Sequence, residues 1–223
     1  MDTKAKGIVL KLSDYKDADK LASIFTLEQG VITAKFTGVK KEKAKLKSVA
    51  QPFVFADFVL NESGKSKTVI SASVIDNFYN ILNTYNKTIM GYIVLDIVKS
   101  ILPNEKPEHD LFLLTLNALN DIEENNEFVA TIKYILKFIA FSGLEIQMPN
   151  IDYVYLDTLT GNFVEKREQG FIAIDKKVYT ALKLLNEEKD VEFNETVLKQ
   201  ILRLLHNIIY LKFNEDIKSF QFI

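Results

Sequence analysis

The sequence of 223 residues contains no cysteine, no tryptophan and only two histidines. Without a thiol, the chain cannot form a disulfide, a thiolate zinc site or an iron–sulfur cluster, and it has no cysteine nucleophile. His109 and His206 have no serine or second ligand at a suitable spacing, so we interpret both as surface histidines. The absence of cysteine also agrees with a reducing compartment.

Long apolar runs are absent as well. The best candidate for a membrane span, Met90–Leu102, is interrupted by Asp96 and Lys99 and is shorter than the ~20 apolar residues that a span requires. Residues 1–7 are polar and lack the apolar core of a signal peptide. We therefore expect a soluble, cytoplasmic protein.

Motifs for catalysis and metal binding are scarce. Gly64-Lys65-Ser66 resembles the end of a phosphate-binding P-loop, but Val59 stands where that motif requires glycine. Asp14, Asp17 and Asp19 are spaced as in calcium loops, yet the glycine and the closing glutamate of such loops are missing. Turn formation or helix capping is the simpler interpretation of these aspartates. We expect no enzymatic activity, no metal and no cofactor.

What the chain does contain is ample apolar material and a pattern that changes near residue 78. Hydrophobic residues make up 48% of the chain, which excludes a disordered protein. Before residue 78, apolar and polar residues alternate with a period of two, which predicts five short strands and a small closed barrel. These strands are expected near residues 8–13, 21–26, 32–37, 53–60 and 67–75, the last two joined by a hairpin loop at 61–65.

After residue 78 the apolar residues recur every three or four positions, as in amphipathic helices. Helices are predicted at about 77–101, 111–122, 128–141, 175–187 and 194–212, with a small hairpin-like insert at about 145–175. The sequence thus predicts an α+β protein with two domains, a five-stranded barrel at 1–78 and a helical domain at 79–223.

The net charge of −2 conceals an uneven distribution. Residues 1–80 hold 13 lysines against 9 acidic residues, and the remainder of the chain has an acidic excess of six. Lysines neutralise phosphates without reading bases, so a lysine-rich loop beside a small barrel favours sequence-independent binding of single-stranded nucleic acid. The alternative is a solvated loop with no ligand. The candidate DNA-binding residues are Lys35, Lys40, Lys41, Lys43, Lys45 and Lys47, with only Glu42 among them.

The last predicted helix offers a second candidate surface. Lys199 and Arg203 lie roughly opposite its apolar stripe, together with His206 and Tyr210. The forked guanidinium of Arg203 suits a carboxylate or a phosphate, although a solvated helix face is the commoner explanation. We take Arg203 and Lys199 as candidate partner-binding residues.

Several segments together resemble proteins of the bacterial RecO family of DNA repair proteins. The N-terminal segments are Gly7-Ile-Val-Leu-Lys11, Tyr15-Lys-Asp-Ala-Asp-Lys20, Phe25-Thr-Leu-Glu-Gln-Gly30, Ala34-Lys-Phe-Thr-Gly38 and Gln51-Pro-Phe53. The C-terminal segments are Phe138-Ile-Ala-Phe-Ser-Gly143-Leu, the stretch from Phe163 to Gly170-Phe171, Arg203-Leu-Leu and Lys218-Ser-Phe-Gln-Phe-Ile223. The resemblance is strong in residues 5–60 and looser between 80 and 140.

The resemblance implies an N-terminal OB-fold and a helical domain. It further implies binding of single- and double-stranded DNA, annealing of complementary strands, recognition of the acidic tail of single-stranded-DNA-binding protein, and loading of RecA together with RecR. The six candidate lysines match the basic segment of the family, and Arg203 matches an arginine in its last helix. The competing hypothesis is a protein–protein adaptor whose helical domain binds an acidic peptide and which binds little DNA.

Two features differ from the family. Many members hold zinc with four cysteines in the insert, whereas this insert has neither cysteine nor histidine, so we expect no zinc. Burial of Tyr153, Tyr155, Phe163 and Phe171 would then have to stabilise it. In addition, lysine replaces almost every arginine of the basic loop, which preserves charge but loses bidentate phosphate contacts.

Overall fold

The computed structural model of the chain describes residues 2–64, 66–151, 154–189 and 191–223. They form two compact units, Met1–Leu82 with Leu95–Leu116, and Asn83–Val94 with Asn117–Ile223. Helices α1 (Tyr85–Ile101) and α2 (His109–Glu124) are each divided between the two units. We call the first the barrel unit and the second the helical unit. No helix in the described part of the chain is long and apolar enough to cross a membrane.

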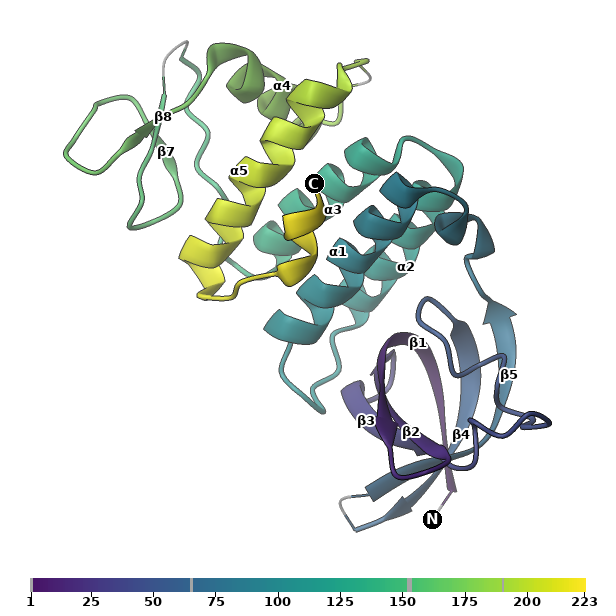
Figure 1. Ribbon diagram of the computed structural model, residues 1–223. Helices are drawn as coiled ribbons and strands as arrows, with labels where there is room; N and C mark the ends of the chain where they lie inside the picture. The colour runs from purple at the N-terminus through teal and green to yellow at the C-terminus, as the bar shows by residue number, and fades with distance from the viewer. Residues whose placement is uncertain (1, 65, 152–153, 190) are drawn as a thin grey trace. The chain divides into compact units, whose positions relative to one another are not determined.

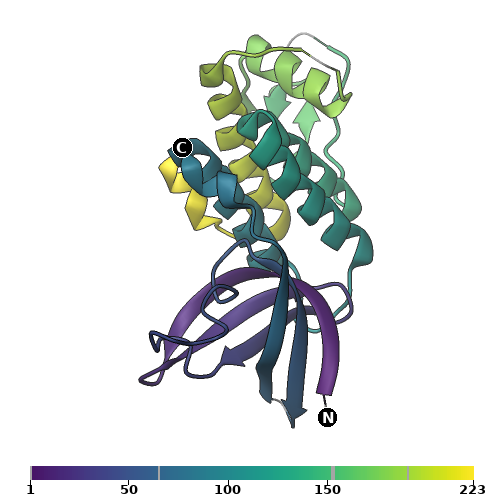
Figure 2. The same cartoon turned by 90° about the vertical axis from the view of Figure 1, so that its right-hand side faces the viewer.

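The barrel unit contains the five predicted strands in a closed barrel of order β1-β2-β3-β5-β4 (Figure 2). Strand β4 closes the barrel through antiparallel pairing with β1, and β3 meets β5 in a short parallel pairing at Ala34–Lys67 and Lys35–Thr68. The predicted α+β class with an N-terminal barrel is confirmed. The strands are β1 (Asp2–Tyr15), β2 (Asp19–Thr26), β3 (Gly30–Phe36), β4 (Phe55–Ser63) and β5 (Ser66–Asp76).

Alternate residues of these strands point inward, as the period of two predicts. Ile24, Ile32 and Phe58 are almost fully buried in the barrel core. Strand β1 departs from this alternation because its register with β2 shifts between Val9 and Lys11, where Leu10 forms a β-bulge. The bulge places Lys11 opposite Ser23 of β2.

The segment 95–116 covers one side of the barrel within the same unit. The Phe112 ring lies 5.3 Å from Phe25 and 6.1 Å from Phe55, measured between ring centroids. At the start of β3, the Glu105 N–H donates to the Val31 carbonyl at 3.0 Å. Apolar burial and backbone pairing therefore both attach this segment to the strands.

The single helix predicted from residue 77 is wrong in its first part. Strand β5 ends at Asp76, a 3-10 turn η1 covers Tyr79–Asn83, and α1 runs only from Tyr85 to Ile101. The interruption has a local cause, since Phe78 takes a left-handed φ of 44° and its N–H donates to the Asp76 carboxylate at 3.0 Å. Tyr85 is 65% exposed, so the apolar stripe is not continuous there.

The other predicted helices are present as α2 (His109–Glu124), α3 (Glu127–Phe141), α4 (Lys176–Asn186) and α5 (Glu195–Phe213), and the chain then forms the 3-10 turn η2 (Lys218–Phe222) (Figure 1). Asn126, Asp175 and Asn194 cap the starts of α3, α4 and α5, because the side chain of each accepts a backbone N–H of the first turn. These short polar residues explain why the helices begin where they do.

The predicted insert is a small sheet of order β7-β6-β8 formed by Tyr155–Leu156, Phe163–Val164 and Ile172–Ala173. Phe163 is buried and packs edge-on against Tyr179 at 5.0 Å, whereas Tyr155 and Phe171 are half-buried. Tyr153 lies outside the described residues.

A polar contact also holds the insert, because the Asn162 side-chain oxygen accepts from the Lys212 ammonium at 3.1 Å. Burial lowers the pKa of Lys212. Among the described residues no group of three His, Asp or Glu side chains could hold a metal. The residues present therefore do not fit the zinc site of the family.

Candidate nucleic-acid interface

The loop between β3 and β4, residues 37–54, is folded onto the barrel. Val39, Val49 and Ala50 belong to the barrel core, and Leu46 packs against it. The loop also bonds to itself, for example from the Ala50 N–H to the Leu46 carbonyl at 3.0 Å. Apolar side chains of the loop thus pack against the barrel core, while its lysines remain exposed to solvent.

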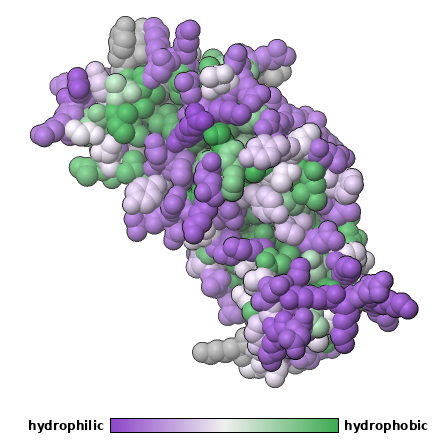
Figure 3. All heavy atoms as spheres, viewed as in Figure 1, coloured by the Kyte–Doolittle hydropathy of each residue, from purple (hydrophilic) through white to green (hydrophobic). Residues whose placement is uncertain are grey.

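Five of these lysines form a surface that we call the lysine ridge. Hydrophilic side chains project from this part of the barrel unit in Figure 3. The lysine ridge consists of Lys40, Lys41, Lys43, Lys45 and Lys47, all exposed. Only Lys40 has an ion pair within the described part of the chain, so the other four ammonium groups can meet an external anion.

The end of β1, the turn after it and the start of β2 together hold the beginning of the ridge loop. The Gly38 N–H donates to the Asp19 carboxylate at 2.7 Å, and the Lys40 N–H donates to the Ala18 carbonyl at 3.0 Å. The Lys40 ammonium also pairs with the Asp14 carboxylate at 2.9 Å. Asp19, the first residue of β2, therefore anchors a loop 19 residues away. No local pattern in the sequence indicates that contact.

Lys35 is set apart from the ridge. It is half-buried in β3, where it pairs in register with Leu21 of β2 and Thr68 of β5. The structure thus brings five of the six candidate lysines together on the loop and leaves the sixth on the sheet. Whether any of them binds DNA stays a prediction.

Removing the acidic partner of the ridge should strengthen binding of an anion. We expect Asp14→Asn to tighten the binding of a single-stranded oligonucleotide by about two- to threefold at low salt, because the change frees Lys40 and removes one negative charge. Fluorescence anisotropy of a labelled oligo-dT measures this. Asp57→Asn, an equal charge change on exposed Asp57 of β4, is the control, and equal gains in both variants would contradict a specific effect on Lys40.

The two candidate partner-binding residues lie one turn apart on α5, and both have contacts within the helical unit. The Arg203 guanidinium donates to the Ile223 carbonyl at 2.9 Å. The Lys199 ammonium pairs with Glu195 at 2.9 Å and lies 5.7 Å from the centre of the Phe128 ring. Nearby, His206 stacks on Phe220 at 4.5 Å and contacts Asp216 at 3.1 Å.

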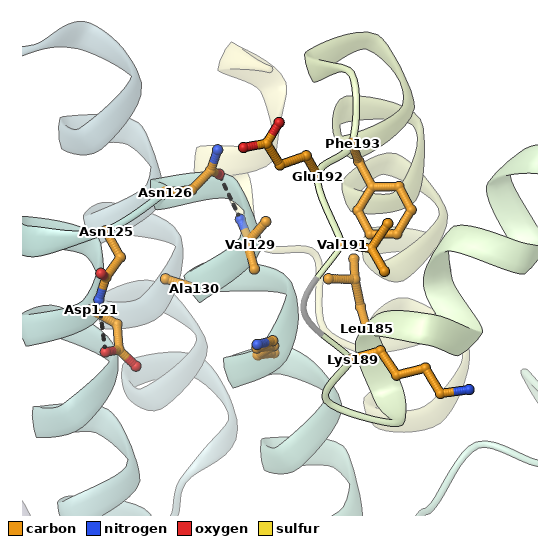
Figure 4. Close-up of a pocket in the computed structure, with 11 residues that line it drawn as sticks. Asp121, Asn125, Asn126, Val129, Ala130, Leu185, Lys189, Val191, Glu192 and Phe193 are labelled. Atoms are coloured by element: carbon orange, nitrogen blue, oxygen red, sulfur yellow. Dashed lines mark hydrogen bonds between the residues drawn. The ribbon is translucent and has the colours of Figure 1, made fainter.

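A hollow of about 580 Å³ opens elsewhere in the helical unit, between the corner of α2 and α3 and the segment after α4 (Figure 4). Its apolar lining includes Val129 and Leu185. Its described lining holds two basic residues, Lys133 and Lys189, and two acidic residues, Asp121 and Glu192. Their charges cancel. The hollow therefore does not favour an acidic ligand, and neither Arg203 nor Lys199 lines it.

The barrel and its loop define a class of protein. A closed five-stranded barrel with order β1-β2-β3-β5-β4 is an OB-fold, a domain that commonly binds oligonucleotides or oligosaccharides on the face of its second and third strands. Residues 1–78 match the family described as "Recombination protein O N terminal".

Full-length relatives agree with that match. The chain is 28% identical to the DNA repair protein RecO of Caldicellulosiruptor saccharolyticus over 201 residues, which cover 89% of this chain and 78% of the relative. It is 28% identical to the DNA repair protein RecO of Bacillus subtilis over 175 residues, 77% of this chain and 68% of the relative. Residues 1–78 thus match the RecO family model, and most of the chain is similar to DNA repair proteins RecO, a likeness that supports a role in DNA repair and recombination.

Proposed function

We propose that this protein is a recombination mediator that binds DNA through the lysine ridge and promotes annealing of complementary strands. The observation that supports the proposal is the ridge itself, five exposed lysines on a folded loop, four of them without an ion pair in the described residues. Each lysine that neutralises a phosphate releases a condensed counterion, which favours binding of any sequence.

Annealing follows from the same electrostatics. Two complementary strands repel each other through their phosphates, and a surface of fixed positive charge lowers that repulsion while both are bound. Lysine contacts the backbone and leaves base edges free to pair. No bond is made or broken in this mechanism, so we propose a protein without turnover chemistry or cofactor.

Partners follow from the family resemblance and are proposals as well. We propose that the helical unit recognises the acidic tail of single-stranded-DNA-binding protein at Arg203 and Lys199, and that RecR cooperates in loading RecA in the cytoplasm. Arg203 supports this because its guanidinium has five donors, and its bond to Ile223 uses one of them.

Annealing of complementary oligonucleotides, with and without single-stranded-DNA-binding protein, tests the proposal. We expect the protein to accelerate the gain of duplex at least tenfold over the spontaneous rate, including on strands already coated by that protein. A tail-deleted single-stranded-DNA-binding protein is the control. No acceleration on bare strands would exclude annealing, and equal acceleration with intact and tail-deleted coats would exclude tail recognition.

A further inference from the structure

Three aspartates lie at or beside the turn that joins β1 to β2, and their surroundings differ. Asp14 of β1 pairs with the Lys40 ammonium at 2.9 Å, whereas Asp19 of β2 accepts the Gly38 N–H at 2.7 Å. Asp17 is exposed in the turn itself, and within the described residues its carboxylate has no hydrogen-bonding or ionic partner. Both aspartates that have a partner therefore contact the loop that carries the lysine ridge.

The contact of Asp19 fixes the point at which the loop leaves the sheet. Gly38 lies just beyond the end of β3 and has a left-handed φ of 65°, so the chain changes direction there. A hydrogen bond to an ionised carboxylate is stronger than one between neutral groups. A backbone bond adds to it, since the Lys40 N–H donates to the Ala18 carbonyl at 3.0 Å. The turn between β1 and β2 thus holds the loop at its first residues.

A series of backbone turns connects this point to the lysines that follow. The Gly38 carbonyl accepts the Lys41 N–H at 3.1 Å. The Lys41 carbonyl in turn accepts the Ala44 N–H at 3.1 Å, and the Ala44 carbonyl accepts the Lys47 N–H at 3.2 Å. Each bond spans three residues, as in a 3-10 turn. The position of Gly38 therefore affects the positions of the lysines along the whole ridge.

Apolar burial contributes little to the middle of this loop. Of residues 40–48, only Ala44 and Leu46 are half-buried, and the other side chains are exposed. The far end of the loop is held by the backbone of β1, because the Phe53 N–H donates to the Val9 carbonyl at 3.0 Å. The segment that carries the lysines thus depends on its two ends for a defined conformation.

We infer that Asp19 is a positioning residue for nucleic-acid binding by the lysine ridge, an inference that rests on the proposed function. A loop that is already ordered loses less conformational entropy when a strand binds to it. As a negative charge near the lysines, Asp19 by itself weakens the attraction of an anion. Its effect through the Gly38 bond has the opposite sign, so experiment can separate the two.

A pair of alanine variants tests this inference. Asp19→Ala and Asp17→Ala remove the same charge from positions close together in the sequence, but only the first removes the acceptor of the Gly38 N–H. We expect Asp19→Ala to bind oligo-dT about fivefold more weakly than the wild type at 50 mM salt, because the free loop is less ordered. Asp17→Ala should bind as the wild type does, or up to about twofold more tightly. Fluorescence anisotropy measures both affinities.

Two further substitutions separate the charge of Asp19 from its geometry. Asp19→Asn loses the charge but keeps a side-chain oxygen that accepts an N–H, so its affinity should stay within about twofold of the wild type. Asp19→Glu keeps the charge and displaces the carboxylate by one methylene. It should bind oligo-dT about two- to threefold more weakly than Asp17→Glu. This charge-matched pair also provides the test if Asp19→Ala does not fold.

Amide hydrogen exchange measures the order of the loop directly. In Asp19→Ala, amides of residues 38–47 should exchange about tenfold faster than in the wild type, while those of the barrel strands keep their rates. Exchange that rises equally in loop and strands would indicate general destabilisation and would overturn the inference.

The binding results distinguish this inference from the proposed function. If the wild type binds oligo-dT without salt dependence, the proposed function fails, and the inference fails with it. If the wild type binds as expected but Asp19→Ala equals Asp17→Ala, the proposed function stands and Asp19 has no positioning role. A loss in Asp19→Asn as large as that in Asp19→Ala would assign the effect to charge and would also overturn the inference.

Discussion

Removal of four ridge lysines is expected to abolish most of the salt dependence of single-stranded DNA binding. The variant carries alanine at Lys40, Lys41, Lys43 and Lys45. Four phosphate contacts correspond to a slope of roughly −3, so the wild type should lose about fiftyfold in affinity between 50 and 200 mM salt. At 50 mM salt the ridge variant should bind single-stranded DNA at least tenfold more weakly than the wild type. Its affinity should then change little as the salt concentration rises.

The structure supplies the reason to expect a folded variant. The four side chains are exposed, and the apolar residues that fix the loop, such as Val39 and Val49, are unchanged. A control with the same change in net charge places alanine at four exposed lysines of the helical unit, Lys166, Lys176, Lys177 and Lys218. Equal slopes for the two variants would refute a DNA site on the ridge.

The second large effect concerns stability rather than binding. Gly30 begins β3 with a φ of +71°, and a β-carbon there would lie 2.1 Å from the Lys106 carbonyl oxygen. The oxygen belongs to the backbone and the β-carbon is held rigidly by it, so neither can move without shifting a strand or the segment 95–116. We expect Gly30→Ala to lower the free energy of unfolding by about 3 kcal/mol or more, as overpacking and left-handed strain combine.

Gly64→Ala separates these two costs. Gly64 has a similar φ of +59°, but a β-carbon there would meet no atom within 4 Å. This variant should lose only about 1 kcal/mol, the cost of left-handed strain alone. Urea unfolding followed by circular dichroism measures both, and similar losses would mean that the contact with Lys106 is not rigid. If Gly30→Ala yields no folded protein while Gly64→Ala folds, the loss of stability at Gly30 exceeds the stability of the protein, and the prediction is confirmed.

The parts of the fold that could be predicted are those fixed by short-range patterns. Alternation along 32–37 and the three- to four-residue spacing along 128–141 correspond to β3 and α3 because each pattern buries one face of its own element. The lysine ridge could be predicted too, since charge density is visible in the sequence. Its anchoring could not, because Asp19 meets Gly38 only after β2 and β3 have paired.

The parts that could not be predicted depend on the backbone or on distant partners. Nothing in the spacing around Leu10 indicates the bulge that turns Lys11 outward. The break between β5 and η1 depends on the left-handed φ of Phe78, a residue type that rarely adopts it. Likewise, the guanidinium of Arg203 indicates a binding residue from the sequence, but its bond to Ile223 forms only once the helical unit has folded.

The attachment of residues 95–116 to the barrel has a consequence for how such a protein can evolve. Phe112 covers Phe25 and Phe55, yet the chain reaches it only after η1 and the whole of α1. A gene segment that encoded residues 1–78 alone would therefore be transferred to a new host protein with an uncovered apolar face. Residues 1–78 of this chain are therefore not an interchangeable cassette, because their apolar surface is covered by residues that follow them.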